Sequence, residues 1–302
     1  MNLELAREFI YRNARPLDLA LWRFFMEQGS MEEVLTCLSF YQNEDGGFGH
    51  GLEADSFNPE STPIQTWQAT KILQQIDFTD SSHPMVQGIL RYLESGKEFS
   101  ERTRSWSGTV KSNDDYPHAV WWSYSEKKEY SPNPTAALAG FIVRHAPKES
   151  ELWKKGRDLA KDACDWLVDK YPIGDEHDLA CFIQLYDDLE RADVTEIIDR
   201  DDLKRRLIEL VPMLVCSDTE RWGKDYVVLP SRFIRSRDSL FYKGNEELVQ
   251  QECEYLEKAQ LEDGSFVVPW QWCTDYKEYE IAVNWWKSVM ILENARFVKA
   301  FE

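Results

Sequence analysis

The stretch from Gln42 to Leu73, QNEDGGFGHGLEADSFNPESTPIQTWQATKIL, decides the fold because it has a counterpart near the other end of the chain. The counterpart runs from Gln260 to Ile291 and reads QLEDGSFVVPWQWCTDYKEYEIAVNWWKSVMI. The two stretches share residue types at the same spacing, in the pairs Gln42 and Gln260, Asp45 and Asp263, Gly46 and Gly264, Phe48 and Phe266, Trp67 and Trp285, and Leu73 and Ile291. An internal repeat of this length indicates supersecondary units that stack on one another.

Each copy is predicted to be a helical hairpin. In the first copy, residues 31–42 carry apolar side chains at helical spacing and end at Asp45-Gly46, a strong turn signal because glycine accepts positive φ. Thr62 then offers an N-cap hydroxyl, and Pro63 stands at the first helical position, where helix starts favour proline. Such a hairpin cannot bury its apolar faces alone, so further copies are expected beside it.

The rest of the chain has the same helical character. Apolar periodicity and terminal signals predict further helices over residues 3–13, 16–28, 84–95, 133–145, 150–171, 176–191, 201–215, 245–260 and 279–301. Residues 96–131 and 217–243 are predicted to be irregular and rich in aromatic side chains. Because no Gly-, Ser- or Pro-rich linker divides the chain, we expect one all-α domain over residues 1–302.

Composition limits the partners. A net charge of −19 over 302 residues argues against nucleic acid and anionic membrane surfaces, which both require basic patches. No apolar run approaches the roughly 20 residues of a membrane span, and no signal peptide is recognisable. The six cysteines lack CxxC pairing, which favours a reduced, cytoplasmic protein. With 12 Trp and 13% aromatic residues, the chain has enough aromatic surface for a large core or an aromatic-lined cavity.

The repeat also resembles a known family pattern, aromatic-Leu-x3-Gln-x3-Gly-x-aromatic. The second copy meets this pattern with Tyr255, Leu256, Gln260, Gly264 and Phe266, and the first copy keeps all but the leading aromatic, where Cys37 stands. It is similar to the QW repeat of squalene–hopene cyclases, to the hairpin repeat of protein prenyltransferase β subunits and to the prenyltransferase-like toroid proteins of bacteria. The resemblance implies a single α/α toroid, with inner and outer helices around a central cavity, and structural roles for the repeat Gln and Trp residues.

The resemblance also suggests where acid chemistry would lie. Class II cyclases protonate an alkene or epoxide with the middle Asp of a DxDD motif, and the nearest match is residues 112–115, Ser-Asn-Asp-Asp, which would make Asp114 the acid. Ser112 stands where the first Asp belongs, which removes one of the neighbouring carboxyls that help to keep an acid protonated. The zinc ligands of protein prenyltransferases are not matched, because Cys273 and Asp275 come in the reverse order with no His after them. We therefore expect no metal and no cofactor.

Two segments are candidates for the site. In the first, Asp114, Asp115 and His118 are predicted to be catalytic, since adjacent carboxylates and a titratable His suit proton transfer. Tyr116, Trp121 and Trp122 of the same segment are predicted to bind substrate, the alternative being a turn with an aromatic anchor.

The second segment follows the glycine turn. Here Glu53 and Asp55 are predicted to be acid/base groups and His50 a substrate-binding residue, the alternative being a solvated loop. Further substrate-binding candidates are Trp222 and Tyr226 in the 217–243 loop, and Trp270 and Trp272, for which core packing is the alternative.

Three functions follow from these residues. The first is an enzyme resembling terpene cyclases or prenyltransferases, which binds a small hydrophobic, isoprenoid ligand and starts carbocation chemistry with an acid. The second is a carbohydrate-active enzyme, a glycoside hydrolase or lyase of (α/α) barrel type with paired carboxylates. The third is a non-catalytic toroid that binds a ligand, since fold alone does not fix function.

Overall fold

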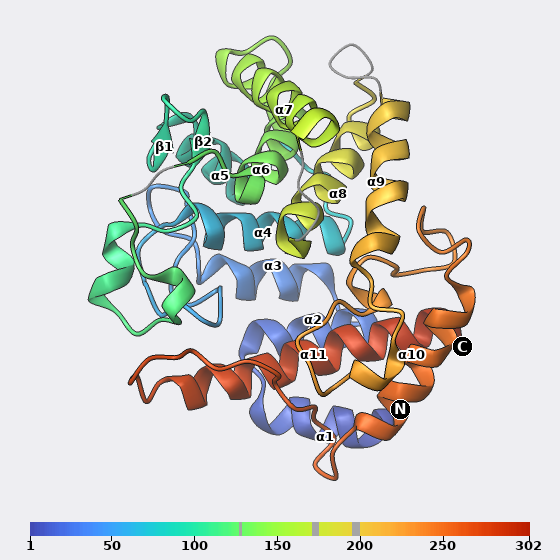
Figure 1. Cartoon of the computed structure of the whole chain (residues 1–302). Helices are drawn as coiled ribbons and strands as arrows, with labels where there is room; N and C mark the ends of the chain where they lie inside the picture. The colour runs from blue at the N-terminus through green and yellow to red at the C-terminus, as the bar shows by residue number, and fades with distance from the viewer. Residues whose placement is uncertain (127–128, 171–174, 195–199) are drawn as a thin grey trace. The chain divides into compact units, whose positions relative to one another are not determined.

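The computed structural model describes residues 1–126, 129–170, 175–194 and 200–302. Within these residues the regular structure is eleven α-helices with one hairpin of two very short strands and four 3₁₀ helices (Figure 1). The all-α prediction is confirmed. The elements are α1 (Leu3–Asn13), α2 (Pro16–Met26), α3 (Met31–Ser39), α4 (Pro63–Gln75), α5 (Pro84–Glu94), β1 (Phe99–Ser100), β2 (Ser105–Trp106), η1 (Lys111–Asp115), η2 (Val120–Trp122), α6 (Pro132–His145), α7 (Glu151–Lys170), α8 (Glu176–Arg191), α9 (Arg200–Leu214), η3 (Thr219–Arg221), η4 (Pro230–Arg232), α10 (Glu246–Ala259) and α11 (Tyr279–Phe301).

The helix starts follow the predicted local signals. Helices α2, α4, α5 and α6 each begin with a proline, whose fixed φ and missing N–H suit the first turn. The Thr62 hydroxyl caps α4 by accepting a hydrogen bond from the backbone N–H of Gln65 (3.1 Å). Helix α3 ends at Ser39, three residues earlier than predicted, because the following residues already belong to the turn, where Asn43 N–H donates to Gly47 O (2.9 Å).

Backbone contacts group the chain into two compact units. Unit 1 comprises Met1–Leu38 and Val211–Glu302, and unit 2 comprises Ser39–Leu210. Each unit contains one copy of the repeat. The single domain over residues 1–302 stays a prediction. None of the described helices is both long and apolar enough to cross a membrane.

Unit 2 is built around α6, which is buried on nearly every side. Helix α6 packs against α5 and α7, its neighbours in sequence, and against α4 and α8, two helices away on either side (Figure 1). Glycines allow the close approach. A Cβ at Gly140 of α6 would lie 3.0 Å from Leu185 Cα of α8, and a Cβ at Gly156 of α7 would lie 2.4 Å from Ile142 Cγ2 of α6. Small residues on α6 and α7 therefore serve helix packing.

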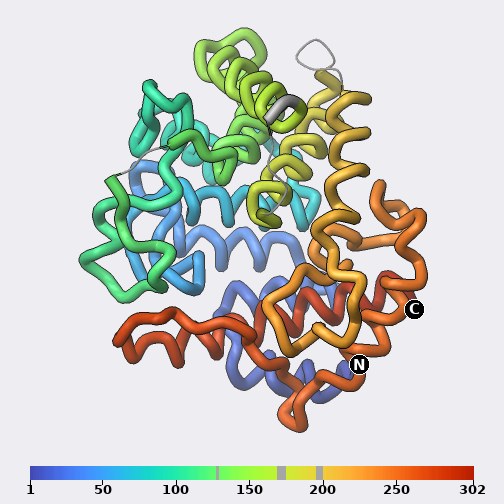
Figure 2. Tube along the Cα trace, in the orientation of Figure 1, coloured from blue at the N-terminus to red at the C-terminus, as the bar shows by residue number. Residues whose placement is uncertain are grey.

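Unit 1 brings the two ends of the chain together. Helix α11 packs against α1, α2 and α10, so that the first helices and the last one lie side by side (Figure 2). Side chains of α11 reach backbone carbonyls at the ends of both N-terminal helices: Asn284 Nδ2 donates to Asn13 O (3.1 Å), and Lys299 Nζ donates to Phe25 O (3.2 Å).

The repeat glutamines make equivalent contacts in the two units. Gln42 Nε2 donates to the carbonyl of the repeat glycine four residues later (2.9 Å) and to Met85 O (3.0 Å), in the first turn of α5. Gln260 Nε2 donates to its own repeat glycine (3.0 Å) and to Asn2 O (3.0 Å), at the N-cap of α1. Each glutamine therefore ties its turn to the start of another helix, which explains why Gln and Gly keep the same spacing.

Unit 2 also contains a buried ion pair that yields a prediction. Arg144 Nη1 lies 3.1 Å from Asp188 Oδ1, and the two side chains are 8% and 1% exposed. Arg144→Met leaves the Asp188 charge buried without its partner, so we expect a loss of about 3 kcal/mol in the free energy of unfolding at pH 8. Burial raises the pKa of Asp188 to about 7 even though Arg144 opposes this, so the loss should shrink as pH falls and Asp188 takes up a proton.

The control for this prediction is Arg104→Met on the surface of the same unit. Arg104 pairs with Asp162, and both side chains are exposed, so this substitution should cost less than about 1 kcal/mol at either pH. Urea denaturation at pH 8 and pH 6 measures both variants. Equal losses for the two arginines would show that burial does not strengthen the Arg144 pair.

Candidate active site

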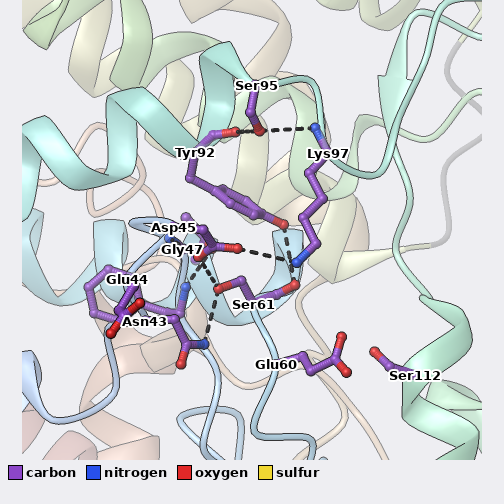
Figure 3. A network of polar contacts seen from close by, with 12 residues as sticks. Asn43, Glu44, Asp45, Gly47, Glu60, Ser61, Tyr92, Ser95, Lys97 and Ser112 are labelled. Carbon is purple, nitrogen blue, oxygen red and sulfur yellow. Dashed lines mark hydrogen bonds and ion pairs between the residues drawn. The ribbon is translucent and has the colours of Figure 1, made fainter.

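The loop after the first Asp-Gly turn is held at both ends by one polar network (Figure 3). Asp45 Oδ1 accepts hydrogen bonds from Gly47 N–H (3.0 Å) and from the Ser61 hydroxyl (2.5 Å). Asn43 Nδ2 donates to Ser61 Oγ (3.0 Å), and Lys97 Nζ lies 3.2 Å from Asp45 Oδ2. The start of the loop at residue 43 is thereby joined to its end at residue 61.

The aspartate of this network stays ionised. Burial alone would raise the pKa of Asp45, but hydrogen bonds from Ser61 and Gly47 and the nearby Lys97 outweigh burial and lower the pKa below its usual value. The second copy has an equivalent turn, in which Asp263 Oδ1 accepts from Ser265 N–H (2.9 Å). The shared Asp is therefore a turn-forming residue in both units.

Between its fixed ends the loop buries two carboxyl groups. Glu53 and Asp55 are each only 4% exposed. Glu53 Oε2 accepts a hydrogen bond from Gln68 Nε2 (2.7 Å), and Glu53 Oε1 accepts a longer one from Asp55 N–H (3.4 Å). Leu52 N–H donates to Gln65 Oε1 (2.9 Å), which fixes the loop to α4. The alternative of a solvated loop is therefore wrong for these two acids.

Burial gives Glu53 an unusual proton affinity. Loss of water, and secondly the charge of Asp55, raise the pKa of Glu53 from about 4.5 to about 7, against the opposing effect of Lys71. A substantial fraction of Glu53 is thus protonated at neutral pH. A carboxylic acid of this kind, beside a second carboxyl, suits general acid catalysis.

One face of α4 completes the surroundings of Glu53. Gln65, Gln68 and Lys71 follow at intervals of three residues, and Lys71 Nζ donates to Gln68 Oε1 (3.1 Å). The Lys71 ammonium also lies 4.9 Å from the centre of the Trp67 ring. These polar residues are not among the candidates predicted from the sequence, although polar side chains at helical spacing on a largely buried helix are a signal that could have found them.

The structure brings the two candidate segments together. Ala119 N–H donates to Asp55 O (2.9 Å), and Asn58 Nδ2 donates to Asn113 Oδ1 (2.8 Å). His118 forms a backbone bridge with the residue after Asp55 and is 5% exposed. The carboxyl pair and the 113–119 segment therefore belong to one region, although about 60 residues separate them.

The polar groups of that second segment are held locally. His118 Nδ1 lies 2.7 Å from Tyr116 O, so the proton is on this nitrogen, because a carbonyl only accepts. His118 Nε2 lies 3.1 Å from Ser123 Oγ. Asp114 accepts from Tyr124 N–H (2.9 Å), and its side chain is 51% exposed.

Exposure separates the predicted acids. Asp114 and Asp115 are both exposed residues of η1, whereas Glu53 is buried. Their catalytic roles stay predictions. Glu53 differs from them in its burial, and burial favours the protonated form of a carboxyl group.

The aromatic candidates of unit 2 differ in accessibility. Trp121 is 42% exposed, Trp122 and Tyr116 are half-buried, and the exposed His50 places Nε2 2.8 Å from Asn43 Oδ1. The Trp122 indole N–H is buried, with no hydrogen-bond acceptor among the described residues. Trp121 is therefore the most accessible aromatic side chain of this segment.

In unit 1 the aromatic candidates form two groups. Trp222 and Trp272 are buried, and Trp222 donates through Nε1 to Cys216 O (3.0 Å), as a core residue does. Tyr226 is 59% exposed and lies edge-to-face with Trp270, with 6.5 Å between the ring centres. Tyr226 and Trp270 are thus the pair that is better placed to meet a ligand.

Comparisons with known proteins add no relative. No protein-family model, curated protein or solved structure matches the chain. In the described part of the chain, no group of three or more His, Cys, Asp or Glu side chains is arranged to hold a metal ion. The assignment of function therefore depends on the geometry around Glu53.

Proposed function

We propose that the chain is an α/α toroid of the terpenoid cyclase and prenyltransferase type. Two features support this. In unit 2, α6 contacts both α4 and α8, as inner helices of a toroid contact one another while skipping the outer helix between them. In both units, the repeat Gln bonds its own turn and the start of another helix.

Its activity is acid-initiated chemistry on a hydrophobic, isoprenoid ligand, with Glu53 as the acid. The supporting observation is the buried Glu53 beside Asp55, with a pKa of about 7. Protonated Glu53 gives its proton to an alkene carbon and becomes a carboxylate, and the resulting carbocation is stabilised by nearby carboxylates and aromatic faces. Glu53 thus takes the role that the sequence predicted for Asp114.

A carbohydrate-active enzyme is the second candidate. The observation in its favour is that two carboxyl groups, not one, are buried at the site, and that the Gln68 amide donates a hydrogen bond to one of them, Glu53 Oε2 (2.7 Å). Paired carboxylates are the usual catalytic groups of glycoside hydrolysis.

Native mass spectrometry of the purified chain tests the choice. We expect a retained lipid, and binding of farnesyl or geranylgeranyl diphosphate or squalene in preference to a panel of oligosaccharides. Products of bound isoprenoids are then sought by gas chromatography. Retention of an oligosaccharide would replace the first proposal by the second, and binding of neither class would refute both.

Asp114→Asn serves as the control for the assignment of the acid. Because Asp114 is half-exposed and caps Tyr124 N–H, its carboxamide should keep that contact and leave turnover within about threefold of wild type. If Asp114→Asn lowers turnover as much as replacement of Glu53 does, Asp114 is the acid, as the sequence predicted.

A further inference from the structure

We propose that Gln68 is a positioning residue whose amide, oriented by Lys71, confines the Glu53 proton to Oε1. The proposal depends on the proposed function only in treating Glu53 as the acid. The contacts that carry it all lie in unit 2 and do not involve a substrate.

Lys71 determines which way the Gln68 amide faces. Its Nζ lies 3.1 Å from Gln68 Oε1. An ammonium group only donates hydrogen bonds, so the amide atom that faces it must be the carbonyl oxygen. Lys71 is itself held over the Trp67 ring. The NH₂ group of Gln68 is therefore directed away from Lys71 and toward Glu53.

The oriented amide then distinguishes the two oxygens of Glu53. Gln68 Nε2 donates to Oε2 at 2.7 Å, so a proton on Oε2 would compete with the amide hydrogen. Among the described residues, Oε1 accepts a single hydrogen bond, the 3.4 Å contact from Asp55 N–H, which is at the weak end of hydrogen bonding. The protonated acid therefore carries its hydrogen on Oε1, the oxygen that contacts Asp55.

Reversal of the amide would move the proton. A flipped Gln68 would present its carbonyl oxygen to Glu53 Oε2. Because a carbonyl oxygen only accepts hydrogen bonds, the proton of Glu53 would then lie on Oε2 and be donated to the amide. The direction in which Glu53 delivers its proton thus depends on Lys71, which acts on the carboxyl group through the Gln68 amide.

Charge and orientation must be separated in the test. The charged or titratable groups around Glu53 are Asp55 in the same loop, Lys71 on α4 and His118 on the segment paired with the loop. Lys71 also lowers the Glu53 pKa by its charge, so its removal acts in two ways. A double-mutant cycle of Lys71 and Gln68 isolates the part of the Glu53 pKa change that depends on the Gln68 amide.

The experiment follows the Glu53 carboxyl carbon and the Gln68 side-chain amide by NMR during a pH titration. In wild type, the Gln68 Nε2 signal should titrate with the same midpoint as the Glu53 carboxyl. Lys71→Met should raise the Glu53 pKa by about one pH unit when Gln68 is present and by less than half of that in a Gln68→Leu background. Arginine, like lysine, only donates hydrogen bonds, so the Lys71→Arg variant should show the same titration of Glu53 as wild type.

Two results would overturn the proposal. Equal effects of Lys71→Met in the two backgrounds would mean that Lys71 acts through charge alone. In wild type, a Gln68 Nε2 signal that does not change while Glu53 titrates would show that the hydrogen bond from Gln68 does not orient the Glu53 proton. A wild-type Glu53 that titrates near 4.5 would instead count against the proposed function, so the two failures are distinct. Amide spectra of each variant establish that it is folded.

Discussion

Replacement of Gly46 by alanine is expected to lower the free energy of unfolding by about 4 kcal/mol, or to prevent folding. Two effects add. Gly46 has φ = +92°, where an alanine costs about 1–2 kcal/mol. A Cβ at this position would also lie 2.0 Å from Gly88 O and 2.5 Å from Gly88 C, and backbone atoms of α5 cannot move aside as a flexible side chain can.

Gly96→Ala separates the two effects. Gly96 lies in the same unit and also has positive φ, +69°, but a Cβ there would meet nothing within 4 Å. Its replacement should therefore cost only the conformational part, about 1–2 kcal/mol. Urea denaturation of both variants gives the difference, and a Gly46 variant no less stable than the Gly96 variant would show that the α5 contact is easily relieved.

The same comparison can be made in unit 1, where it tests the equivalence of the two repeats. Gly264 has φ = +87°, and a Cβ would lie 2.3 Å from Leu5 O of α1. Gly244 has φ = +91° and open space around it. If the two copies are equivalent, Gly264→Ala should lower the free energy of unfolding more than Gly244→Ala does. The difference should equal the difference between Gly46→Ala and Gly96→Ala in unit 2.

Helix positions were predictable because their signals are local. The prolines at the first positions of α4 and α5, the Thr62 cap and the Asp45-Gly46 turn act within a few residues of the chain. The observed helices accordingly follow the predicted ranges closely.

Burial in loops was not predictable in the same way. Residues 49–62 contain two glycines, three acids and one proline, a composition that is also typical of a solvated loop. Glu53 and Asp55 are buried because α4 and the distant 117–119 segment cover them, and these contacts cannot be read from spacing. For the same reason, adjacent acids at Asp114 and Asp115 gave no indication that both are exposed.

Replacement of Glu53 by glutamine is expected to reduce turnover by about 10²–10⁴-fold, the usual contribution of a general acid. Glutamine has nearly the same shape and can still accept a hydrogen bond from Gln68, but it has no proton of suitable acidity to give. The compound identified by mass spectrometry is the substrate for this assay, and Asp114→Asn is the matched control because it also removes one carboxyl charge from the same region.

The same substitution should stabilise the fold at high pH. Glu53 has a folded-state pKa of about 7, raised from about 4.5, so its contribution to stability is fully present below about pH 4.5 and is lost as pH rises through 7. Above pH 7, wild type must keep an ionised carboxyl buried beside Asp55, whereas glutamine stays neutral. Glu53→Gln should therefore be more stable than wild type by on the order of 2 kcal/mol at pH 8, and nearly equal to it at pH 5.

Urea denaturation at the two pH values distinguishes a catalytic acid from a structural one. A carboxyl group that exists to hold the loop in place should leave the protein less stable when it is replaced, at every pH. A catalytic carboxyl group that is buried at a cost in stability should give the opposite result. Its replacement should reduce turnover and increase the free energy of unfolding at pH 8. A Glu53→Gln variant that is destabilised at pH 8 would therefore remove the physical basis for treating Glu53 as the acid.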